Sequence, residues 1–374
     1  MHESTKQFHV HEEHSTVITP TARFTDADDG TYHLFMNRSN GVTLKWGATE
    51  DDDPPYSPWG PEIADIEIST SCSGIPDADG VTAGCPMCYK CCTPNGTYMK
   101  FETFKAIFDR LNKQHTLNQI AFGSDATGTA NPDMWKMFDY CHKHAVTPNI
   151  TVAHISDDTA DKLVASCGAV AVSWYPLRNK QVCYDSIDKL TNAAERAGKK
   201  MQINMHALLA EETLPHFDEL IEDIRNDIRL RKLNAVVLLS LKQKGRGTGW
   251  HRVSQADFNK LLDNFGFAGI RYGMDSCSAN KFMAYIDKHP EYVCYKTMIE
   301  SCESTLFSSY INVEGKFFPC SFMEGEGDWA EGIDVCSYAD FKEVWLHPKT
   351  QAWRAQYLEQ IEKGGCTGCP YYNV

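Results

Sequence analysis

Cysteine is the residue type whose number and spacing most clearly indicate chemistry in this chain. The sequence holds 15 cysteines among 374 residues, an odd number that cannot be paired completely within one chain. A secreted disulfide-rich protein would normally be shorter and carry an export signal, and residues 1–4 lack the basic and then apolar pattern of one. The composition therefore favours thiolates that bind metal in a reducing compartment, and we expect a cytoplasmic protein.

The first group of cysteines consists of Cys72, Cys85 and Cys88. Twelve residues, polar and glycine-containing, separate Cys72 from the segment Cys85-Pro86-Met87-Cys88-Tyr89. Cysteine thiolates bind the irons of a cubane cluster, and four of them would saturate it. Three thiolates leave one iron open to a small molecule, so this group predicts a [4Fe-4S] cluster with a chemical role.

Cys91 and Cys92 leave two alternatives open. Cys85, Cys88 and Cys91 form another triplet, and the same three residues with Cys92 could form a zinc site. We prefer Cys72 as the third ligand because it follows a predicted strand closely. The open iron would then lie at the carboxyl end of that strand.

The second group of cysteines comes late in the sequence. Its four members are Cys302, Cys320, Cys366 and Cys369. The segment between the first two reads as a β-hairpin with Glu314-Gly315 at its turn. Four thiolates suffice to close a cluster completely, with zinc on the same ligands as the alternative. Cys277 could be an additional ligand or a residue that faces the substrate.

The elements between the two groups alternate between strand and helix patterns. The expected strands cover residues 63–69, 118–123, 148–154, 169–174, 201–206 and 235–240. The expected helices cover residues 101–111, 133–144, 158–165, 186–197, 212–231 and 256–265. About six βα units imply parallel strands with right-handed crossovers. We therefore expect an α/β fold with a partial (βα)6 TIM-like barrel, whose active site lies at the carboxyl ends of the strands.

Three segments follow from these patterns: an N-terminal β extension at 1–60, the partial barrel at 61–270, and a small cysteine-rich C-terminal domain at 271–374. The extension has strand-like stretches at 32–36 and 42–46 around the turn signal Asn40-Gly41. Its early histidines are His2, His9, His11 and His14. They could bind metal, but we expect a mobile polar tail. The glycine-rich turn at 244–247 could contact a carboxylate or phosphate, or could be solvated.

The cysteine segment Cys85-Pro86-Met87-Cys88-Tyr89 resembles the signature of the radical S-adenosylmethionine (SAM) superfamily. That signature has three cysteines, the last two separated by two residues with an aromatic residue nearby. The first spacing departs from it, because the family usually has three residues where this chain has twelve. The second group resembles the SPASM and twitch extensions of such enzymes. The further cysteines of the full SPASM pattern are missing, which favours the twitch type with one auxiliary [4Fe-4S] cluster.

The resemblance also assigns candidate residues for SAM binding. Gly123, Ser124 and Asp125 end the second expected strand, where the family carries a Gly-Gly-Glu-like motif that binds the amino group of SAM. Ser173 and Asn204 stand where the family often contacts the SAM carboxylate or ribose, although a routine barrel-lining role is as good an explanation.

Tyr89 would lie beside the first cluster. In the family an aromatic residue in this region can flank the adenine of SAM. Simple packing of the ring is the alternative, and the residue alone does not decide between the two.

The function that the resemblance implies is reductive cleavage of SAM to a 5′-deoxyadenosyl radical, which abstracts hydrogen from a substrate. The electron would come from a flavodoxin- or ferredoxin-like donor. A peptide is the leading substrate class, with crosslinking, thioether formation or epimerisation as outcomes. A small metabolite, sugar or nucleotide is the second hypothesis, and a non-catalytic metal-binding scaffold the third. The net charge of −14 disfavours nucleic acid, and we find no apolar run suited to a membrane.

Overall fold

The parallel strands and their helices form the main body of the protein. The structure, a computed structural model, describes residues 6–49, 52–299 and 301–362. Six strands lie parallel and side by side in chain order: β6 (Ile63–Glu67), β9 (Gln119–Gly123), β10 (Thr147–Val152), β11 (Ala169–Trp174), β12 (Gln202–Leu209) and β13 (Ala235–Ser240). All six expected strands, and the α/β class with a parallel sheet, are therefore confirmed. A short seventh strand, β14 (Tyr272–Met274), pairs with β13 and was not expected.

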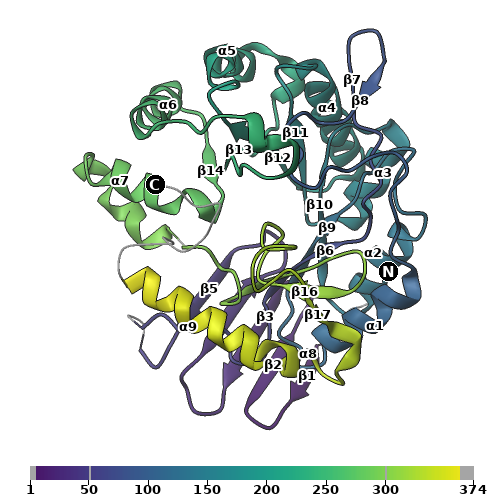
Figure 1. Cartoon of the computed structure of the whole chain (residues 1–374), viewed down its shortest axis with the longest axis vertical. Coiled ribbons are helices and arrows are strands. Elements are labelled where there is room, and N and C mark those ends of the chain that lie inside the picture. Colours follow the sequence, from purple (N-terminus) through teal and green to yellow (C-terminus); the bar gives the residue numbers. More distant parts are fainter. Residues whose placement is uncertain (1–5, 50–51, 300, 363–374) are drawn as a thin grey trace.

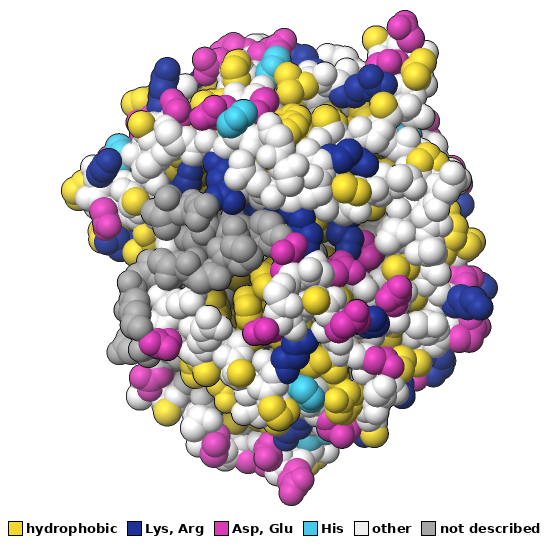
Figure 2. Space-filling view, in the orientation of Figure 1, with side chains coloured by type: hydrophobic (Ala, Val, Ile, Leu, Met, Phe, Trp, Pro, Cys, Tyr) yellow, Lys and Arg dark blue, Asp and Glu magenta, His cyan; other side chains and the backbone are white. Residues whose placement is uncertain are grey.

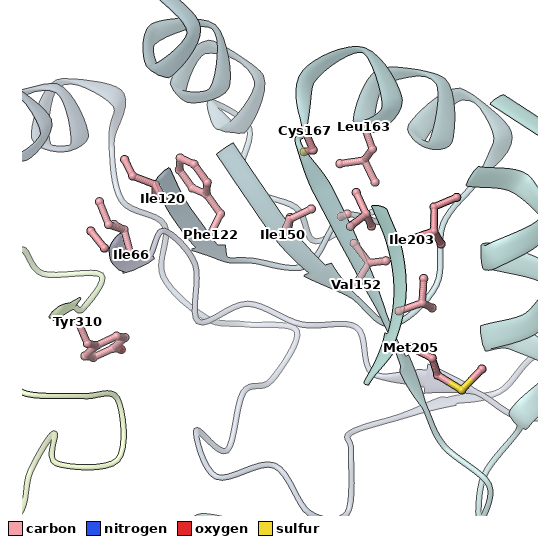
Figure 3. Close-up of a cluster of buried hydrophobic side chains, with 14 of the residues drawn as sticks. Ile66, Ile120, Phe122, Ile150, Val152, Leu163, Cys167, Ile203, Met205 and Tyr310 are labelled. Atoms are coloured by element: carbon pink, nitrogen blue, oxygen red, sulfur yellow. The ribbon is translucent and has the colours of Figure 1, made fainter. Parts of the chain in front are cut away.

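Helices cover one side of this sheet, which follows an arc in Figure 1. They are α1 (Phe101–Leu111), α2 (Met134–Lys143), α3 (Asp157–Ser166), α4 (Lys180–Ala197), α5 (Phe217–Asn226) and α6 (Gln255–Ala268). Alternate strand residues point toward the helices and form the core, as Ile120, Phe122 and Ile150 do in Figure 3. Burying these apolar side chains is what holds the helices to the sheet. The intervening strand residues face the opposite, inner side.

Two helices differ from the expected ranges for local reasons. The expected helix 212–231 is wrong: α5 is shorter, with 3-10 turns at Leu214–His216 and Ile228–Leu230 on either side. Asp227 ends α5 because its backbone is extended and its carboxylate accepts the N–H of Arg229 at 2.9 Å. In contrast, α4 begins six residues earlier than expected, where Asn179 caps it by accepting the N–H of Gln181.

The C-terminal part continues the same sheet. β15 (Ser308–Ile311) pairs in parallel with β6, and β16 (Lys316–Phe318) returns beside it, with β17 (Ile333–Asp334) beyond. The hairpin expected around Glu314-Gly315 is confirmed, and Gly315 has the left-handed backbone (φ 83°) that the turn requires. The remaining helices are α7 (Ala279–Ile286), α8 (Phe341–Trp345) and α9 (Pro348–Glu362). The domain limits at 60 and 270 stay predictions. No helix within the described ranges has both the length and the apolar character needed to cross a membrane.

The N-terminal segment forms a separate antiparallel sheet of five strands. They are β1 (Gln7–Val10), β2 (His14–Ile18), β3 (Ala22–Ala27), β4 (His33–Asn37) and β5 (Thr43–Trp46), and only the last two were expected. Its inner face meets the beginnings of the parallel strands. Arg23 donates to the carbonyl of Leu117 and to Asn118 Oδ1, just before β9, and Gln202 at the start of β12 donates to the carbonyl of Asn40. The sheet thus covers the amino ends of the parallel strands.

The histidines of this segment do not form a mobile tail, so that expectation is wrong. His14 is buried in β2, and its Nε2 lies 2.9 Å from the carbonyl oxygen of Gln114. The ring of His9 stacks on His115 with 3.6 Å between centroids, and His11 Nε2 lies 3.2 Å from His115 Nδ1. Strand pairing places these polar side chains against the main body. His2 lies outside the described residues.

Candidate metal and cofactor site

The first cysteine loop begins at the carboxyl end of β6 and returns to it. Cys72 donates its N–H to the carbonyl of Thr93 at 2.9 Å, and β-bridges join Ser71 to Thr93 and Ser69 to Tyr98. The backbone is close here, because a Cβ on Gly96 would overlap the backbone of Thr70 and Ser71. The start and end of the loop are therefore fastened together at the edge of the sheet where the site was expected.

The twelve residues between Cys72 and Cys85 fold as a small hairpin. Its strands are β7 (Ile75–Pro76) and β8 (Thr82–Ala83), which project from the body in Figure 1. Gly74 sits at the base with φ +88°, and a Cβ there would overlap the carbonyl of Ala83. Because the hairpin closes on itself, the long spacing still leaves Cys72 and Cys85 at adjoining ends of its base.

Four thiols of the loop lie within electrostatic reach of one another. A hydrogen bond from the Cys92 thiol lowers the pKa of Cys88 and raises that of Cys92. Burial raises the pKa of Cys72 and brings that of Cys85 to about 12, and the charge of Cys88 contributes to both shifts. Cys91, by contrast, is exposed. The loop thus brings together Cys72, Cys85 and Cys88, with Cys92 as their neighbour.

The spacing of these thiols bears on the kind of metal group they could hold. Across the described part of the chain, no three His, Cys, Asp or Glu side chains converge as they would around a single metal ion. A cubane cluster is larger than one ion and is held by thiolates on its separate irons. The donor set of Cys72, Cys85 and Cys88, three half-buried thiols, fits the thiolate ligands of such a cluster.

Arg246 holds the backbone of this loop. Its Nε donates to the carbonyl of Cys85 at 2.8 Å, its terminal nitrogens lie 3.4 Å from the carbonyl of Cys92, and its N–H donates to the carbonyl of Cys88 at 3.0 Å. Gly245 has φ +55°, and a Cβ on it would overlap the carbonyl of Tyr89. The glycine-rich turn at 244–247 is thus packed on the cysteine loop and is not a solvated turn.

Asp125 fastens the same loop to the end of β9. Its carboxylate accepts the N–H and hydroxyl of Ser73 at 3.3 and 3.0 Å, the hydroxyl of Thr127 at 2.6 Å, and the hydroxyl of Thr129. Burial pushes the pKa of Asp125 up, but these hydrogen bonds outweigh it, so the pKa is lowered. The carboxylate is therefore charged and turned toward the residue that follows Cys72.

Gly123 and Ser124 complete the turn at the end of β9. A Cβ on Gly123 would lie 3.2 Å from the Cα of Glu67, so glycine lets β9 approach β6 closely here. The hydroxyl of Ser124 donates to the carbonyl of Asp125 at 2.9 Å. Both residues lie beside the cysteine loop, at the carboxyl edge of the sheet.

The candidate residues on β11 and β12 lie at different distances from the carboxyl ends of their strands. Ser173, near the carboxyl end of β11, is in register with His206. Asn204 lies two residues earlier on β12 and accepts a hydrogen bond from Asn234 at 2.9 Å, so it is nearer the amino end. His206 was missed, although a polar residue two positions after Asn204 in a largely apolar strand could have indicated it. The alternation of buried residues along β12 places the ring of His206 on the inner side of the sheet. Burial lowers the pKa of His206 to about 4, so the ring is neutral.

Tyr89 turns toward the C-terminal part of the chain. Its ring lies 4.5 Å from the ring of Phe322, centroid to centroid, and burial raises its pKa. The ring therefore packs against Phe322, and a contact of Tyr89 with the adenine of SAM stays a prediction.

The second group of cysteines is described in part. Cys302 and Cys320 are half-buried, whereas Cys366 and Cys369 lie outside the described residues. Cys277 joins them: burial is the main cause of its raised pKa, and the charges of Cys302 and Cys320 add to it. Beside Cys277, the buried Lys242 forms an ion pair with Asp275. The structure therefore brings Cys277 to the second group.

Basic side chains surround the middle of this face. Figure 2 shows a hollow near the centre of the molecule with Lys and Arg side chains gathered around it. An acid, Asp65 on β6, also lies on the inner face of the sheet, because its neighbours Ala64 and Ile66 are buried on the helix side. A polar interior of mixed charge suits a polar, charged ligand better than an apolar one.

Comparison with known proteins gives a likeness at the level of structure. No family model matches the chain, and no curated protein matches it. A structure of SuiB from Streptococcus suis bound to the precursor peptide SuiA superposes with a TM-score of 0.63 and 14% identity, covering 92% of this chain and 95% of that one. The chain has the fold of SuiB. A second SuiB structure, bound to S-adenosylmethionine, gives a TM-score of 0.59 and 12% identity over 93% and 97% of the two chains. The resemblance to radical SAM enzymes is thus confirmed as a likeness of fold.

Proposed function

We propose that this protein is a radical SAM enzyme whose first [4Fe-4S] cluster is held by Cys72, Cys85 and Cys88. The observation that carries the proposal is the gathering of these thiols at the carboxyl edge of a parallel sheet, in a chain with the fold of a protein that binds SAM. We infer that the sheet and its helices act as a partial (βα)6 barrel around this site. When bound, the cluster and SAM would supply one-electron cleavage of SAM and the radical that abstracts hydrogen.

The chain's own residues would orient the ligand and exclude water. Asp125 fixes the cysteine loop through Ser73, and Gly123 keeps β9 close to β6. Ser173 and His206 lie at one level of the inner face and are the better candidates to contact SAM. Asn204 is engaged with Asn234, which supports a structural role for it.

We propose a second, auxiliary [4Fe-4S] cluster on Cys302, Cys320, Cys366 and Cys369. The nearness of Cys277 to the first two supports a thiol-rich pocket there. Reduction of both clusters would require a flavodoxin- or ferredoxin-like donor. Such clusters persist in a reducing compartment, which agrees with the expected cytoplasmic location.

A peptide is the substrate class that we propose. The support is the SuiB structure with a bound precursor peptide, which matches 92% of this chain. Crosslinking, thioether formation and epimerisation all begin with hydrogen abstraction from a carbon. In D₂O, epimerisation adds one deuterium to the peptide, whereas a carbon–carbon crosslink and a thioether each remove two hydrogens. Alkylation of the remaining cysteine thiols then separates the thioether, which consumes a thiol, from the crosslink. A candidate peptide that stays unmodified while SAM is cleaved would favour a small metabolite as substrate. Metal-loaded protein that does not cleave SAM would favour a scaffold role.

The decisive experiment is anaerobic reconstitution followed by reaction with dithionite and SAM. We expect about eight irons per chain for two cubanes and formation of 5′-deoxyadenosine. Cys88→Ala should abolish 5′-deoxyadenosine and lower the iron content to about four per chain, with Cys91→Ala as the matched exposed control. No 5′-deoxyadenosine from fully loaded protein, or zinc without iron after anaerobic purification, would contradict the proposal.

A further inference from the structure

The segments that carry the two groups of cysteines contact each other directly. The loop 321–326 follows Cys320 at once, and Tyr89 and Lys90 follow Cys88 at once. The ring of Phe322 packs on Tyr89, and the Glu324 carboxylate forms an ion pair with Lys90. A few residues of backbone and two side-chain contacts therefore separate one cysteine site from the other.

Lys90 lies at the centre of this connection. Its Nζ is 3.1 Å from Glu67 Oε1 at the end of β6, pairs with Glu324, and donates to the hydroxyl of Tyr310 on β15 at 2.8 Å. The side chains of Lys90 and Glu67 are only 15% and 7% exposed. Hydrogen bonds between charged groups are roughly twice as strong as neutral ones, and more so away from water. Lys90 thus connects the segment after Cys88 to β6, to β15 and to the loop 321–326.

Glu324 is fixed from its other side by the hairpin β15–β16. Asn312 donates to Glu324 Oε1 at 2.8 Å, and the hydroxyl of Tyr310 lies 3.2 Å from Oε2. Asn312 is itself oriented, because its side-chain oxygen accepts the N–H groups of Glu314 and Lys316 at 3.1 and 3.0 Å. The carboxylate therefore has little freedom to leave Lys90.

A second bridge runs parallel to the first. Lys244 donates to the carbonyl of Phe322 at 2.9 Å and to that of Glu324, so it holds the backbone of the loop 321–326. Two residues later, Arg246 holds the carbonyls of Cys85 and Cys92. The turn at 244–247 therefore donates hydrogen bonds to both the segment after Cys320 and the segment 85–92.

We propose that Lys90 and Glu324 are positioning residues that couple the two cysteine sites. Through their ion pair, a backbone that is well ordered in the loop after Cys320 also keeps the backbone of segment 85–92 ordered. The naming of Cys88 and Cys320 as cluster ligands rests on the proposed function. The coupling itself is made by side chains of the chain and exists without metal. Without the Lys90 ammonium, Glu67 and Glu324 would face each other as partly buried carboxylates, which costs free energy. Without the Glu324 charge, the loop 321–326 loses its ion pair with Lys90 and keeps only the contact of Phe322 with Tyr89 and the bridge through Lys244 and Arg246.

Hydrogen–deuterium exchange on the metal-free protein tests the coupling independently of activity. We expect Lys90→Met and Glu324→Gln each to speed exchange about tenfold or more in peptides that cover 85–92 and 321–326. Lys90→Arg keeps the charge and should restore slow exchange in large part. Lys105→Met is the matched control, because Lys105 also pairs with a carboxylate, Asp109, but is 47% exposed. Glu324→Gln, nearly unchanged in shape, serves if Lys90→Met fails to fold.

A second measurement separates the coupling from the proposed function. In reconstituted protein, Cys320→Ser should speed exchange in 85–92 as well as in 321–326. If the wild type binds no iron, the proposed function fails while the metal-free experiment still decides the coupling. Unchanged exchange in 85–92 for both Lys90→Met and Glu324→Gln would overturn the coupling, as would a Cys320→Ser effect confined to 321–326.

Discussion

At the scale of single residues, Asp125 shows how one carboxylate fastens the cysteine loop to the sheet. Its type and position at the end of β9 indicate a carboxylate for the SAM ammonium. In the structure it accepts hydrogen bonds from Ser73, Thr127 and Thr129. These bonds keep it ionised and tie the start of the cysteine loop to the sheet.

We predict that Asp125→Asn destabilises the protein by about 1–3 kcal/mol, because the amide nitrogen cannot accept and leaves partly buried donors unpaired. Urea unfolding of the metal-free protein measures this, with Asp158→Asn as an exposed control whose carboxylate is 76% accessible. Unchanged unfolding together with a loss of SAM affinity would instead make Asp125 a residue that binds SAM directly.

Residue-level prediction from the sequence succeeds where chemistry is local and fails where contacts are distant. The spacing of Cys85 and Cys88 is local, so the two thiols could be grouped before the fold was known. Lys90 gives no such signal, because its partner Tyr310 is 220 positions away. His206 and Asn204 both have the right residue type, and only strand register separates their depths.

At the scale of elements, the hairpin β7–β8 explains the unusual cysteine spacing. Gly74 and Gly80 both have left-handed backbones, with φ +88° and +79°. A Cβ on Gly74 would overlap the carbonyl of Ala83, whereas nothing lies within 4 Å of one on Gly80. An alanine at either position would therefore strain the backbone, but only an alanine at Gly74 would also overlap a neighbouring carbonyl. Comparing the two substitutions separates these effects.

We predict that Gly74→Ala prevents the hairpin from closing at its base and sharply lowers the iron bound after reconstitution. Gly80→Ala should cost only the left-handed backbone penalty of about 1–2 kcal/mol and keep its iron. Iron and sulfide counts with thermal unfolding measure both effects. Equal iron content in the two variants would show that closure of the hairpin does not position Cys72.

The elements themselves were predictable where burial followed a simple period. The six central strands are apolar on their helix-facing side, so alternation indicated them. β1 to β3 gave a weaker signal because their inner face is partly polar: in β2 the buried positions include His14 and Thr16. The end of α5 depends on the backbone of Asp227, which the helical spacing of its apolar residues does not show.

At the scale of the whole molecule, the two ends of the parallel strands have different surroundings. The N-terminal sheet covers the amino ends, and the cysteine loop lies at the carboxyl ends. The contact of the N-terminal sheet with the main body includes a cluster of histidines, His9, His11, His14 and His115. The placement of this cluster at a junction makes the junction sensitive to protonation.

The pH dependence of stability tests this junction. Burial lowers the folded-state pKa of His14 to about 4 and that of His115 to about 3, below the ordinary value of 6.5, and neighbouring histidines contribute to both shifts. The unfolded chain therefore binds more protons than the folded chain below pH 6.5. The contribution of these histidines to the free energy of unfolding is fully present above that pH and is lost as the pH falls toward about 4. For His14 alone the loss is of the order of 3 kcal/mol. Urea unfolding at several pH values measures it, and His14→Gln, whose amide can still donate to the Gln114 carbonyl, should flatten the dependence. An equally steep dependence in His14→Gln would assign the acid sensitivity to groups outside this junction.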